Sequence, residues 1–295
     1  MTLATGSKLA VIDIGSNSVR LFIFSVDGAS AVQVFNDKHF CGLGRDLGTT
    51  GRLNPEAADL TLEKLRSFRV QLDAYEVSET KVIGTAALRE AADAAEFLMR
   101  VKAETGFDIE IIDGEQEAVY AAKGIFFHKP DADGVVADFG GGSLELAQIC
   151  KGSIGYKTSL NLGAHYLHGN ENADALIDRD MAAHPELADA RILFITGGAW
   201  RSLAKAWLQE RGESERPVDS FQFDGAGLIK FCRKMEETPA ETLINDYSIE
   251  PPRAELMAAS ALMLRKLVEK LQPGNIAVSL SGIRDGVVYE LISES

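Results

Sequence analysis

Hydrophobic and polar positions along the first 128 residues predict three strands followed by alternating helices and strands. Short apolar or alternating runs at 8–14, 18–26 and 31–38 are typical of strands, and turn residues separate them. Asn54-Pro55 predicts a helix start, because a capping side chain is followed by proline in the first turn. The other elements expected here are a strand at 81–85, a helix at 93–105 ended by Gly106, a strand at 107–112 and a helix at 115–128.

The same order of elements begins again in the second half of the chain. Its expected strands are short apolar runs between turn residues, at 134–139, 143–150, 153–160, 192–196 and 275–280. The polar stretch 131–134 predicts the junction between the halves. We therefore expect one α/β domain at 1–128 and a second at 129–295. The last helix, at about 284–295, is a candidate to pack back on the first domain.

One motif occurs twice, at 11–18 (VIDIGSNS) and 136–143 (VADFGGGS). Each copy places an acid at the end of a strand, then a glycine turn, then a second strand. The matched pairs are Asp13 with Asp138, Gly15 with Gly140, and Ser18 with Ser143. Such a turn directs several backbone N–H groups into one concavity, which is an anion site. A repeat 125 residues apart is too long for a solenoid, so it predicts a duplicated α/β fold with a cleft between the halves.

Composition and charge narrow the classes of partner. At 295 residues, with 46% apolar and 25% charged residues, the chain is typical of a globular protein of about two domains. A net charge of −14 argues against a broad surface for nucleic acid or anionic membrane, so a polyanionic ligand would need a local basic patch or bound cations. Neither a membrane span nor a signal peptide is visible. Three dispersed cysteines suggest a reducing cytoplasm.

Both glycine turns are candidate phosphate sites. Gly15, Ser16, Asn17 and Ser18 offer N–H groups and hydroxyls, although a plain hairpin turn uses the same residues. Three successive glycines, Gly140, Gly141 and Gly142, cost chain entropy, so we expect the backbone there and at Ser143 to approach a ligand closely. The second turn is neither a P-loop nor a dinucleotide fingerprint, because Gly-Lys-Ser/Thr is absent and a strand follows.

Three acids and one arginine are candidates for chemistry. Asp138 and Glu145 flank the second turn, and hard carboxylate oxygens beside a phosphate suit Mg²⁺. Glu117 opens a helix, where acids are common because of the helix dipole. It also precedes an apolar face, so its carboxylate could accept a proton from an attacking water. Arg89 follows a strand-end Gly-Thr and could bind phosphate, or it could be an ordinary surface arginine.

A further strand-end turn, Thr196-Gly197-Gly198, either approaches a nucleotide or simply ends its strand, and the sequence favours neither reading. The five histidines have no convincing metal-ligand spacing. No serine or cysteine nucleophile has a recognisable elbow or partner histidine.

At 12–18, 84–89, 114–118 and 138–145 the chain resembles the exopolyphosphatase / guanosine pentaphosphate phosphohydrolase family, with weaker echoes at 162–164, 196–198 and 282–286. The resemblance implies duplicated ribonuclease-H-like (actin-like ATPase) domains with the active site in the interdomain cleft. It further implies removal of the terminal phosphate of polyphosphate or the γ-phosphate of guanosine pentaphosphate, and a homodimer.

The resemblance also assigns roles residue by residue. It places the catalytic glutamate at Glu117, the strand-end acid at Asp138 and the acid closing the glycine loop at Glu145. It places phosphate ligands at Ser16, Asn17, Ser18 and Arg89. Leu144 stands where the family often has a hydroxyl. The chain also ends at Ser295 without the extra helical domain of longer members, which predicts a short form or a truncated chain with reduced processivity.

The leading hypothesis is an exopolyphosphatase. The two turns and Arg89 hold terminal phosphates, Mg²⁺ (Mn²⁺ as the alternative) lies at Asp138 and Glu145, and Glu117 activates water. Lys38, Arg45 and Arg52 are candidate contacts for further phosphates. Guanosine pentaphosphate is the second substrate. Two other hypotheses keep the fold: a non-catalytic polyphosphate- or alarmone-binding regulator, and a kinase, which would need a convincing adenosine site.

Overall fold

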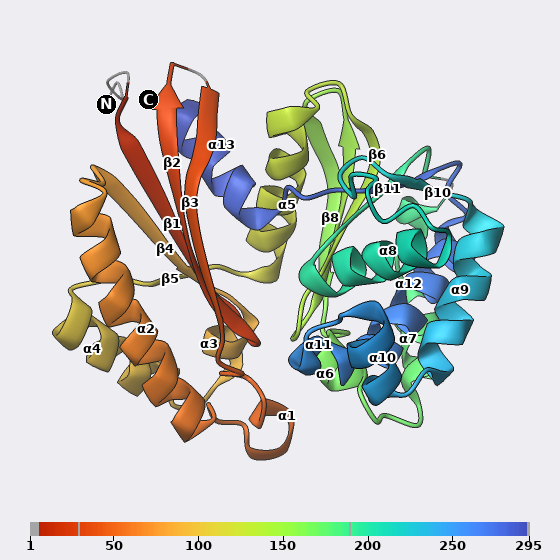
Figure 1. Ribbon diagram of the computed structural model, residues 1–295, viewed down its shortest axis with the longest axis horizontal. Helices are drawn as coiled ribbons and strands as arrows, with labels where there is room; N and C mark the ends of the chain where they lie inside the picture. Colours follow the sequence, from red (N-terminus) through yellow and green to blue (C-terminus); the bar gives the residue numbers. More distant parts are fainter. Residues whose placement is uncertain (1–5, 29, 189, 294–295) are drawn as a thin grey trace. The chain divides into compact units, whose positions relative to one another are not determined.

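The computed structural model describes residues 6–28, 30–188 and 190–293. They form two compact units, one of residues up to Gly124 together with α13 (Ile283–Ser293), and the other of Ile125–Gly282. Each unit contains one β-sheet with helices packed against it (Figure 1). The boundary falls inside helix α5 (Gly114–His128), whereas the sequence prediction placed it at the C-terminal end of that helix.

The sheet of the first unit has the order β3-β2-β1-β4-β5. Its strands are β1 (Lys8–Ile14), β2 (Ser18–Asp27), β3 (Ser30–Phe40), β4 (Glu79–Gly84) and β5 (Glu110–Ile111). The first three form an antiparallel meander, and β4 runs parallel to β1. The middle of β1 is fully buried, which explains why it is a continuous apolar run.

Helices α2 (Pro55–Ala74) and α4 (Ala94–Thr105) cover one face of this sheet, and α13 packs against β1 on the other (Figure 1). The expected cap of α2 is confirmed, because the Asn54 side chain accepts a hydrogen bond from the Ala57 N–H at 2.8 Å. Gly106 ends α4 with φ +75°, a left-handed conformation that suits glycine.

The second unit repeats this plan with the order β10-β11-β9-β6-β7-β8. Its strands are β6 (Asp133–Phe139), β7 (Leu144–Cys150), β8 (Ser153–Leu160), β9 (Leu193–Thr196), β10 (Gln222–Phe223) and β11 (Ile276–Val278). Strands β6, β7 and β8 form the antiparallel meander, and β9 runs parallel to β6 as β4 does to β1. The duplicated α/β fold predicted from the sequence is confirmed, and β10 is an addition to the common plan.

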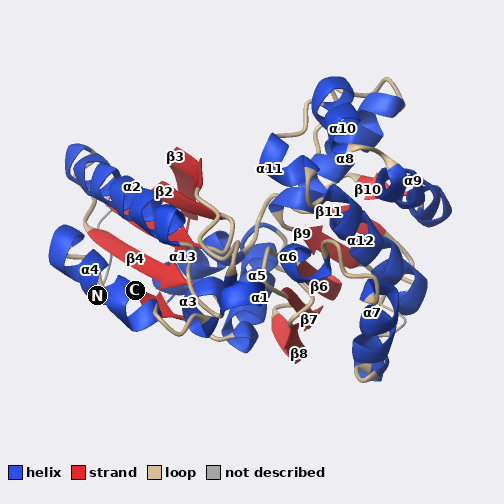
Figure 2. Ribbon diagram, turned by 90° about the horizontal axis from the view of Figure 1, so that it is seen from below, coloured by secondary structure: helices blue, strands red, loops and turns tan. Residues whose placement is uncertain are grey.

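The helices of the second unit build a larger core. They are α6 (Ala164–Leu167), α7 (Ala173–Ala182), α8 (Gly198–Glu210), α9 (Gly225–Glu237), α10 (Ala240–Tyr247), α11 (Pro251–Ala254) and α12 (Met257–Leu271), and Figure 2 shows their placement. The fully buried Trp200 of α8 stacks on Phe139 of β6, with ring centroids 5.0 Å apart. This contact fixes α8 against the strand that leads into the second glycine turn.

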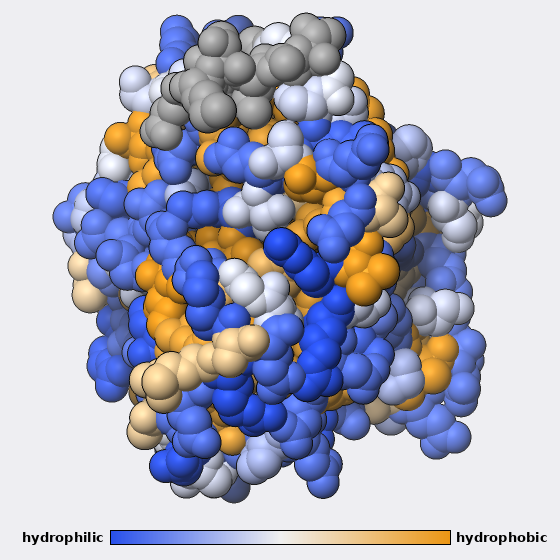
Figure 3. Space-filling model, turned by 90° about the vertical axis from the view of Figure 1, so that its left-hand side faces the viewer, coloured by the Kyte–Doolittle hydropathy of each residue, from blue (hydrophilic) through white to orange (hydrophobic). Residues whose placement is uncertain are grey.

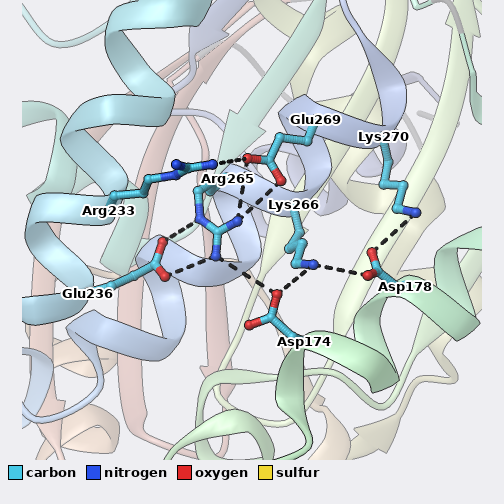
Figure 4. A network of polar contacts seen from close by, with 8 residues as sticks. All are labelled: Asp174, Asp178, Arg233, Glu236, Arg265, Lys266, Glu269 and Lys270. Carbon is cyan, nitrogen blue, oxygen red and sulfur yellow. Dashed lines mark hydrogen bonds and ion pairs between the residues drawn. The ribbon is translucent and has the colours of Figure 1, made fainter.

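An ion network ties α12 to its neighbours (Figure 4). Arg265 of α12 pairs with Glu236 of α9 at 2.6 Å and with Glu269 at 3.2 Å. The next residue, Lys266, lies 3.0 Å from Asp178 of α7. Both cations are largely buried, so each needs its acidic partners to offset the cost of leaving water. The network is therefore part of the scaffold of the second unit.

Several short elements differ from the sequence predictions. Helices α1 (Leu47–Thr50) and α3 (Ala86–Glu90) occupy segments expected as loop and turn, and the strand expected at 107–112 is reduced to β5. Strand β6 begins at Asp133, one residue before the strand start expected at Gly134, so it overlaps the polar stretch 131–134. A Cβ on Gly134 would lie 2.0 Å from the Ile192 carbonyl oxygen, so that glycine serves close strand packing.

The outer face of α2 and α4 has mixed polarity. Figure 3 shows hydrophobic residues interspersed among hydrophilic ones on the side of the molecule that carries these helices. Val70 and Met99 are exposed, and scattered apolar residues of this kind are ordinary on a protein surface. Within the described ranges, no helix combines the length and the apolar character that a membrane crossing requires.

Candidate active site

The first glycine turn, Gly15–Ser18, joins β1 to β2 and is closed by a hydrogen bond from the Gly15 N–H to the Ser18 carbonyl at 3.0 Å. Two of its carbonyl groups accept hydrogen bonds from backbone N–H groups of the loop that follows β3. The Ser16 oxygen accepts from the Gly44 N–H at 2.8 Å. The Asn17 oxygen accepts from the N–H groups of Cys41 and Gly42 at 3.1 and 3.0 Å.

The second turn, Gly140–Ser143, joins β6 to β7 and is closed by the equivalent bond, from the Gly140 N–H to the Ser143 carbonyl at 3.0 Å. Its carbonyls are likewise held from one segment, Gly163–His165, which lies between β8 and α6. Over the part of the chain that the structure describes, the N–H groups of Gly141 and Gly142 make no hydrogen bond within the protein. They are therefore available to an anion.

Asp138 and Glu145 lie directly opposite one another on β6 and β7. Directly opposed positions have Cβ atoms about 4.5–5.5 Å apart and share a face of the sheet. Glu145 is buried and accepts a hydrogen bond from the Ser159 hydroxyl at 2.9 Å. Asp138 lies beside Gly197, where a Cβ would be 3.3 Å from its Oδ1 atom. The strand-end turn Thr196-Gly197-Gly198 therefore borders the carboxylate pair.

The donor set at this pair fits Mg²⁺. No group of three or more side chains of the kinds that bind metals was found among the described residues. Mg²⁺ does not require such a cage, because it is usually held by one or two carboxylates and completes its shell with water and substrate phosphates. Asp138 and Glu145 supply two hard oxygen ligands of this type, next to a turn with available N–H groups.

Glu117 lies buried in the first turn of α5. The helix start is fixed by Asp113, whose side chain accepts from the Gln116 N–H at 2.8 Å. Arg89 of α3 donates from Nη1 to Glu117 Oε1 at 2.5 Å and to the Ile112 carbonyl at 2.9 Å. Two residues that the sequence analysis selected separately, Arg89 and Glu117, therefore form an ion pair with each other. A carboxylate has about four acceptor sites, so a bond from Arg89 does not prevent a role for Glu117 as the acceptor of a proton from water.

The role of Arg89 as a direct phosphate ligand stays a prediction. In the structure its guanidinium group holds Glu117 in place, so it acts first on the candidate base.

A residue that the motif analysis did not select lies beside Asp13. Arg284, at the start of α13, places Nη1 3.4 Å from Asp13 Oδ2 and stacks over the Phe22 ring at 4.5 Å. Burial raises the pKa of Asp13, and the charges of Arg284, Arg20 and Lys38 oppose that rise. Arg284 Nε is buried without a hydrogen-bond partner among the described residues, so it has a donor to offer to water or a ligand.

The three cations whose charges act on Asp13 are Arg20, Lys38 and Arg284, and we call them the basic cluster of the first unit. The pairing register of the predicted hairpin β1–β2 could have shown that Arg20 lies near Asp13, because the two residues are directly opposite one another. The only sequence signal for Arg284 was the weak echo at 282–286. Two other cations, Arg52 and Arg45, stay predicted phosphate contacts. Arg52 pairs with Asp93 at 3.4 Å, and Arg45 lies against Gly42.

Two sheets of the same topology, each carrying a glycine turn after an acidic strand end, define an actin-like ATPase fold. The model of the Ppx/GppA phosphatase family matches residues 22–295, and the chain belongs to this family.

Solved structures agree with this assignment. An exopolyphosphatase from Cytophaga hutchinsonii is 24% identical, with 98% of each chain covered and a TM-score of 0.88. The Aquifex aeolicus member of the Ppx/GppA family is 25% identical, again with 98% of each chain covered and a TM-score of 0.80.

A curated relative from Photobacterium profundum is the guanosine-5'-triphosphate,3'-diphosphate pyrophosphatase. It is 27% identical over 300 aligned residues, which cover 97% of this chain and 59% of that protein. The chain thus spans about three fifths of the length of this relative.

Proposed function

We propose that the protein is a phosphoanhydride hydrolase that releases terminal orthophosphate from inorganic polyphosphate. The observation that carries the proposal is the pair of glycine turns. Each is closed by a hydrogen bond from its first N–H to its last carbonyl, and in each, other carbonyls accept hydrogen bonds from a neighbouring loop segment. This arrangement leaves N–H groups for phosphate oxygens in both units. The proposal requires both turns to contact one phosphate chain.

The chemistry needs mainly positioning and charge neutralisation. In the proposed mechanism the turns bind the terminal phosphates through their N–H groups. Glu117, held by Arg89, orients a water and accepts its proton. Asp138 and Glu145 would hold Mg²⁺, which would neutralise phosphate charge when bound. The leaving group is the shortened polyphosphate, which requires no protonation by a strong acid because its phosphate oxygen is already a stable anion.

Polyphosphate is the first substrate because the basic cluster adjoins the first turn. Arg20 and Lys38 can take phosphates beyond the terminal one, and such contacts need no base recognition. Guanosine pentaphosphate is the second candidate. It is supported by the activity named for the Photobacterium profundum relative. A homodimer and a cytoplasmic location stay predictions from the sequence.

A phosphate-release panel tests the proposal. Tripolyphosphate, long polyphosphate, guanosine pentaphosphate and a simple phosphomonoester would be compared by kcat/KM, each with and without Mg²⁺. We expect Mg²⁺-dependent release from polyphosphates, slower release from guanosine pentaphosphate, and little from the monoester. Equal rates on the monoester would overturn the anhydride assignment. Tight binding of polyphosphate without release would favour the regulator instead.

A further inference from the structure

The segment Gly163–His165 supports the second glycine turn from behind. The N–H groups of Ala164, His165 and Gly163 donate to the carbonyl oxygens of Gly140, Gly141 and Gly142, at 3.1, 2.9 and 3.2 Å respectively. All three carbonyls of the glycine run are therefore held by consecutive residues of one short segment.

Holding these carbonyls determines where the N–H groups of the turn point. In a planar trans peptide, the C=O of one residue and the N–H of the next point in opposite directions. Fixing the carbonyls of Gly140, Gly141 and Gly142 toward the supporting segment therefore aims the N–H groups of Gly141, Gly142 and Ser143 away from it. Those are the groups proposed to bind phosphate.

Gly163 is the residue that permits this contact. A Cβ at this position would lie 2.2 Å from the Gly142 carbonyl carbon, 2.4 Å from the Ser143 nitrogen and 2.5 Å from the Gly141 oxygen. These are backbone atoms, which cannot rotate out of the way. Its own conformation, φ −69° and ψ 168°, is one that any residue adopts. Glycine is therefore required here by contact with the turn and not by backbone strain.

We propose that Gly163 is a positioning residue, whose bare Cα allows the segment 163–165 to hold the turn with its N–H groups directed at a phosphate. The inference rests on the proposed function, since it assigns the turn a phosphate ligand. It extends the site to a segment that contributes no side chain to the chemistry.

Gly163→Ala tests the inference. Because one added methyl group displaces the turn, we expect kcat/KM for tripolyphosphate to fall roughly 10²- to 10³-fold, the range typical when one aimed hydrogen-bond donor is lost. The affinity for tripolyphosphate, measured by calorimetry with Ca²⁺ or Mg²⁺ present, should fall in parallel. The matched control is Gly155→Ala on β8, where the new Cβ would meet only ordinary contacts at 3.5 Å or more, and wild-type values are expected.

If Gly163→Ala does not fold, a second variant tests whether the segment 163–165 positions the turn. Ala164→Pro replaces the N–H that holds the Gly140 carbonyl with a ring CH₂ group, which ends that hydrogen bond and pushes the carbonyl away from the segment. Proline is otherwise tolerated at the first position of a helix such as α6. We expect it to stay folded by thermal unfolding and circular dichroism and to lose tripolyphosphate affinity at least fivefold. Wild-type affinity in a folded variant of either kind would overturn the inference.

These readouts separate this inference from the proposed function. If the wild-type protein binds tripolyphosphate but releases no phosphate, the hydrolase assignment fails. The affinities of the wild-type protein and Gly163→Ala for tripolyphosphate then still test the role of Gly163. If the wild-type protein is active and folded Gly163→Ala keeps both its KM and its affinity, the role of Gly163 fails and the hydrolase assignment stands.

Discussion

The glycine turns of the two units share a backbone plan but differ in what surrounds their strand-end acid. In the first unit, Asp13 lies among cations, with Arg284 at 3.4 Å and the charges of Arg20 and Lys38 acting on it. In the second unit, the equivalent acid faces another carboxylate across the strand pair, Glu145. A single acid among three cations leaves a net positive surrounding, whereas a carboxylate pair attracts a cation.

This difference suggests how one duplicated structure divides the work on a phosphate chain. The backbone N–H groups serve both turns alike, and the side chains around them set the sign of the local field. Under the proposed function, the first turn would suit the anionic chain and the second would suit a bound Mg²⁺. The division also resolves the tension between a net charge of −14 and a polyanionic substrate, because attraction is local to each turn.

The largest expected effect comes from Glu117→Gln, which separates binding from turnover. Loss of a general base typically costs about 10²- to 10⁴-fold in rate, and Gln keeps the size of the side chain and a carbonyl for Arg89. We expect kcat to fall in that range while tripolyphosphate affinity is retained. Glu115→Gln, an exposed neighbour in the same helical turn, is the control. A kcat near wild type for Glu117→Gln would remove Glu117 from the mechanism.

The next effect tests the assignment of the cation to the second turn. Asp138→Asn removes one of the two proposed carboxylate ligands, so we expect the Mg²⁺ concentration for half-maximal activity to rise roughly tenfold or more. Asp13→Asn, at the equivalent position of the first turn, should leave that concentration within about twofold of wild type. Similar Mg²⁺ shifts in both variants would show that the two turns do not divide the charges in this way.

A smaller effect is expected at Arg284, which acts on the first turn. Arg284→Met removes the cation nearest to Asp13 while keeping most of the aliphatic volume over Phe22. We expect KM for polyphosphate to rise about three- to tenfold with a smaller change in kcat, because one charge interaction with the anionic substrate is worth about 1 kcal/mol. Arg284→Lys should restore part of the difference. An unchanged KM at low salt would exclude Arg284 from substrate attraction.

The repeated strand–turn–strand unit could be predicted from the sequence because its signals are local. An apolar strand, an acid and a run of turn residues occur within eight positions of each copy, and the cap at Asn54 lies within three residues of the N–H that it accepts. The choice of Glu117 and Arg89 as chemically important residues came from motifs of similarly short range.

The remaining features depend on contacts between distant segments. Arg89 holds Glu117, which lies 28 positions away, and Arg284 reaches Asp13 across 271 positions. Gly163 supports the second turn only because β8 returns the chain to that end of the sheet. Periodicity and motif spacing carry no record of such pairings. Short elements such as α3 and β10 were missed for the same reason, since neighbouring segments and not their own propensity stabilise them.

The smallest expected effect is on stability and concerns Asp13 again. Burial is the largest influence on its pKa and raises it above the ordinary value, so the buried carboxyl favours its neutral form despite Arg284. A raised pKa in the folded state stabilises the protein below the unfolded-state pKa, and that contribution is lost as pH rises through the folded-state pKa.

The folded state therefore disfavours the ionised form of Asp13 relative to the unfolded chain, and Asp13→Asn should raise the thermal midpoint at pH 7 by no more than a few degrees. The gain should shrink as the pH falls toward the ordinary pKa of an aspartate, where the unfolded chain also takes up the proton. Calorimetry of both proteins at pH 4, 5.5 and 7 measures the trend. A midpoint for Asp13→Asn that is lower than wild type at pH 7 would mean that the pairing with Arg284 outweighs burial. Asp13 would then serve the first turn as one half of a structural ion pair with Arg284. It would not be a charge that lowers the stability of the fold in order to serve ligand binding.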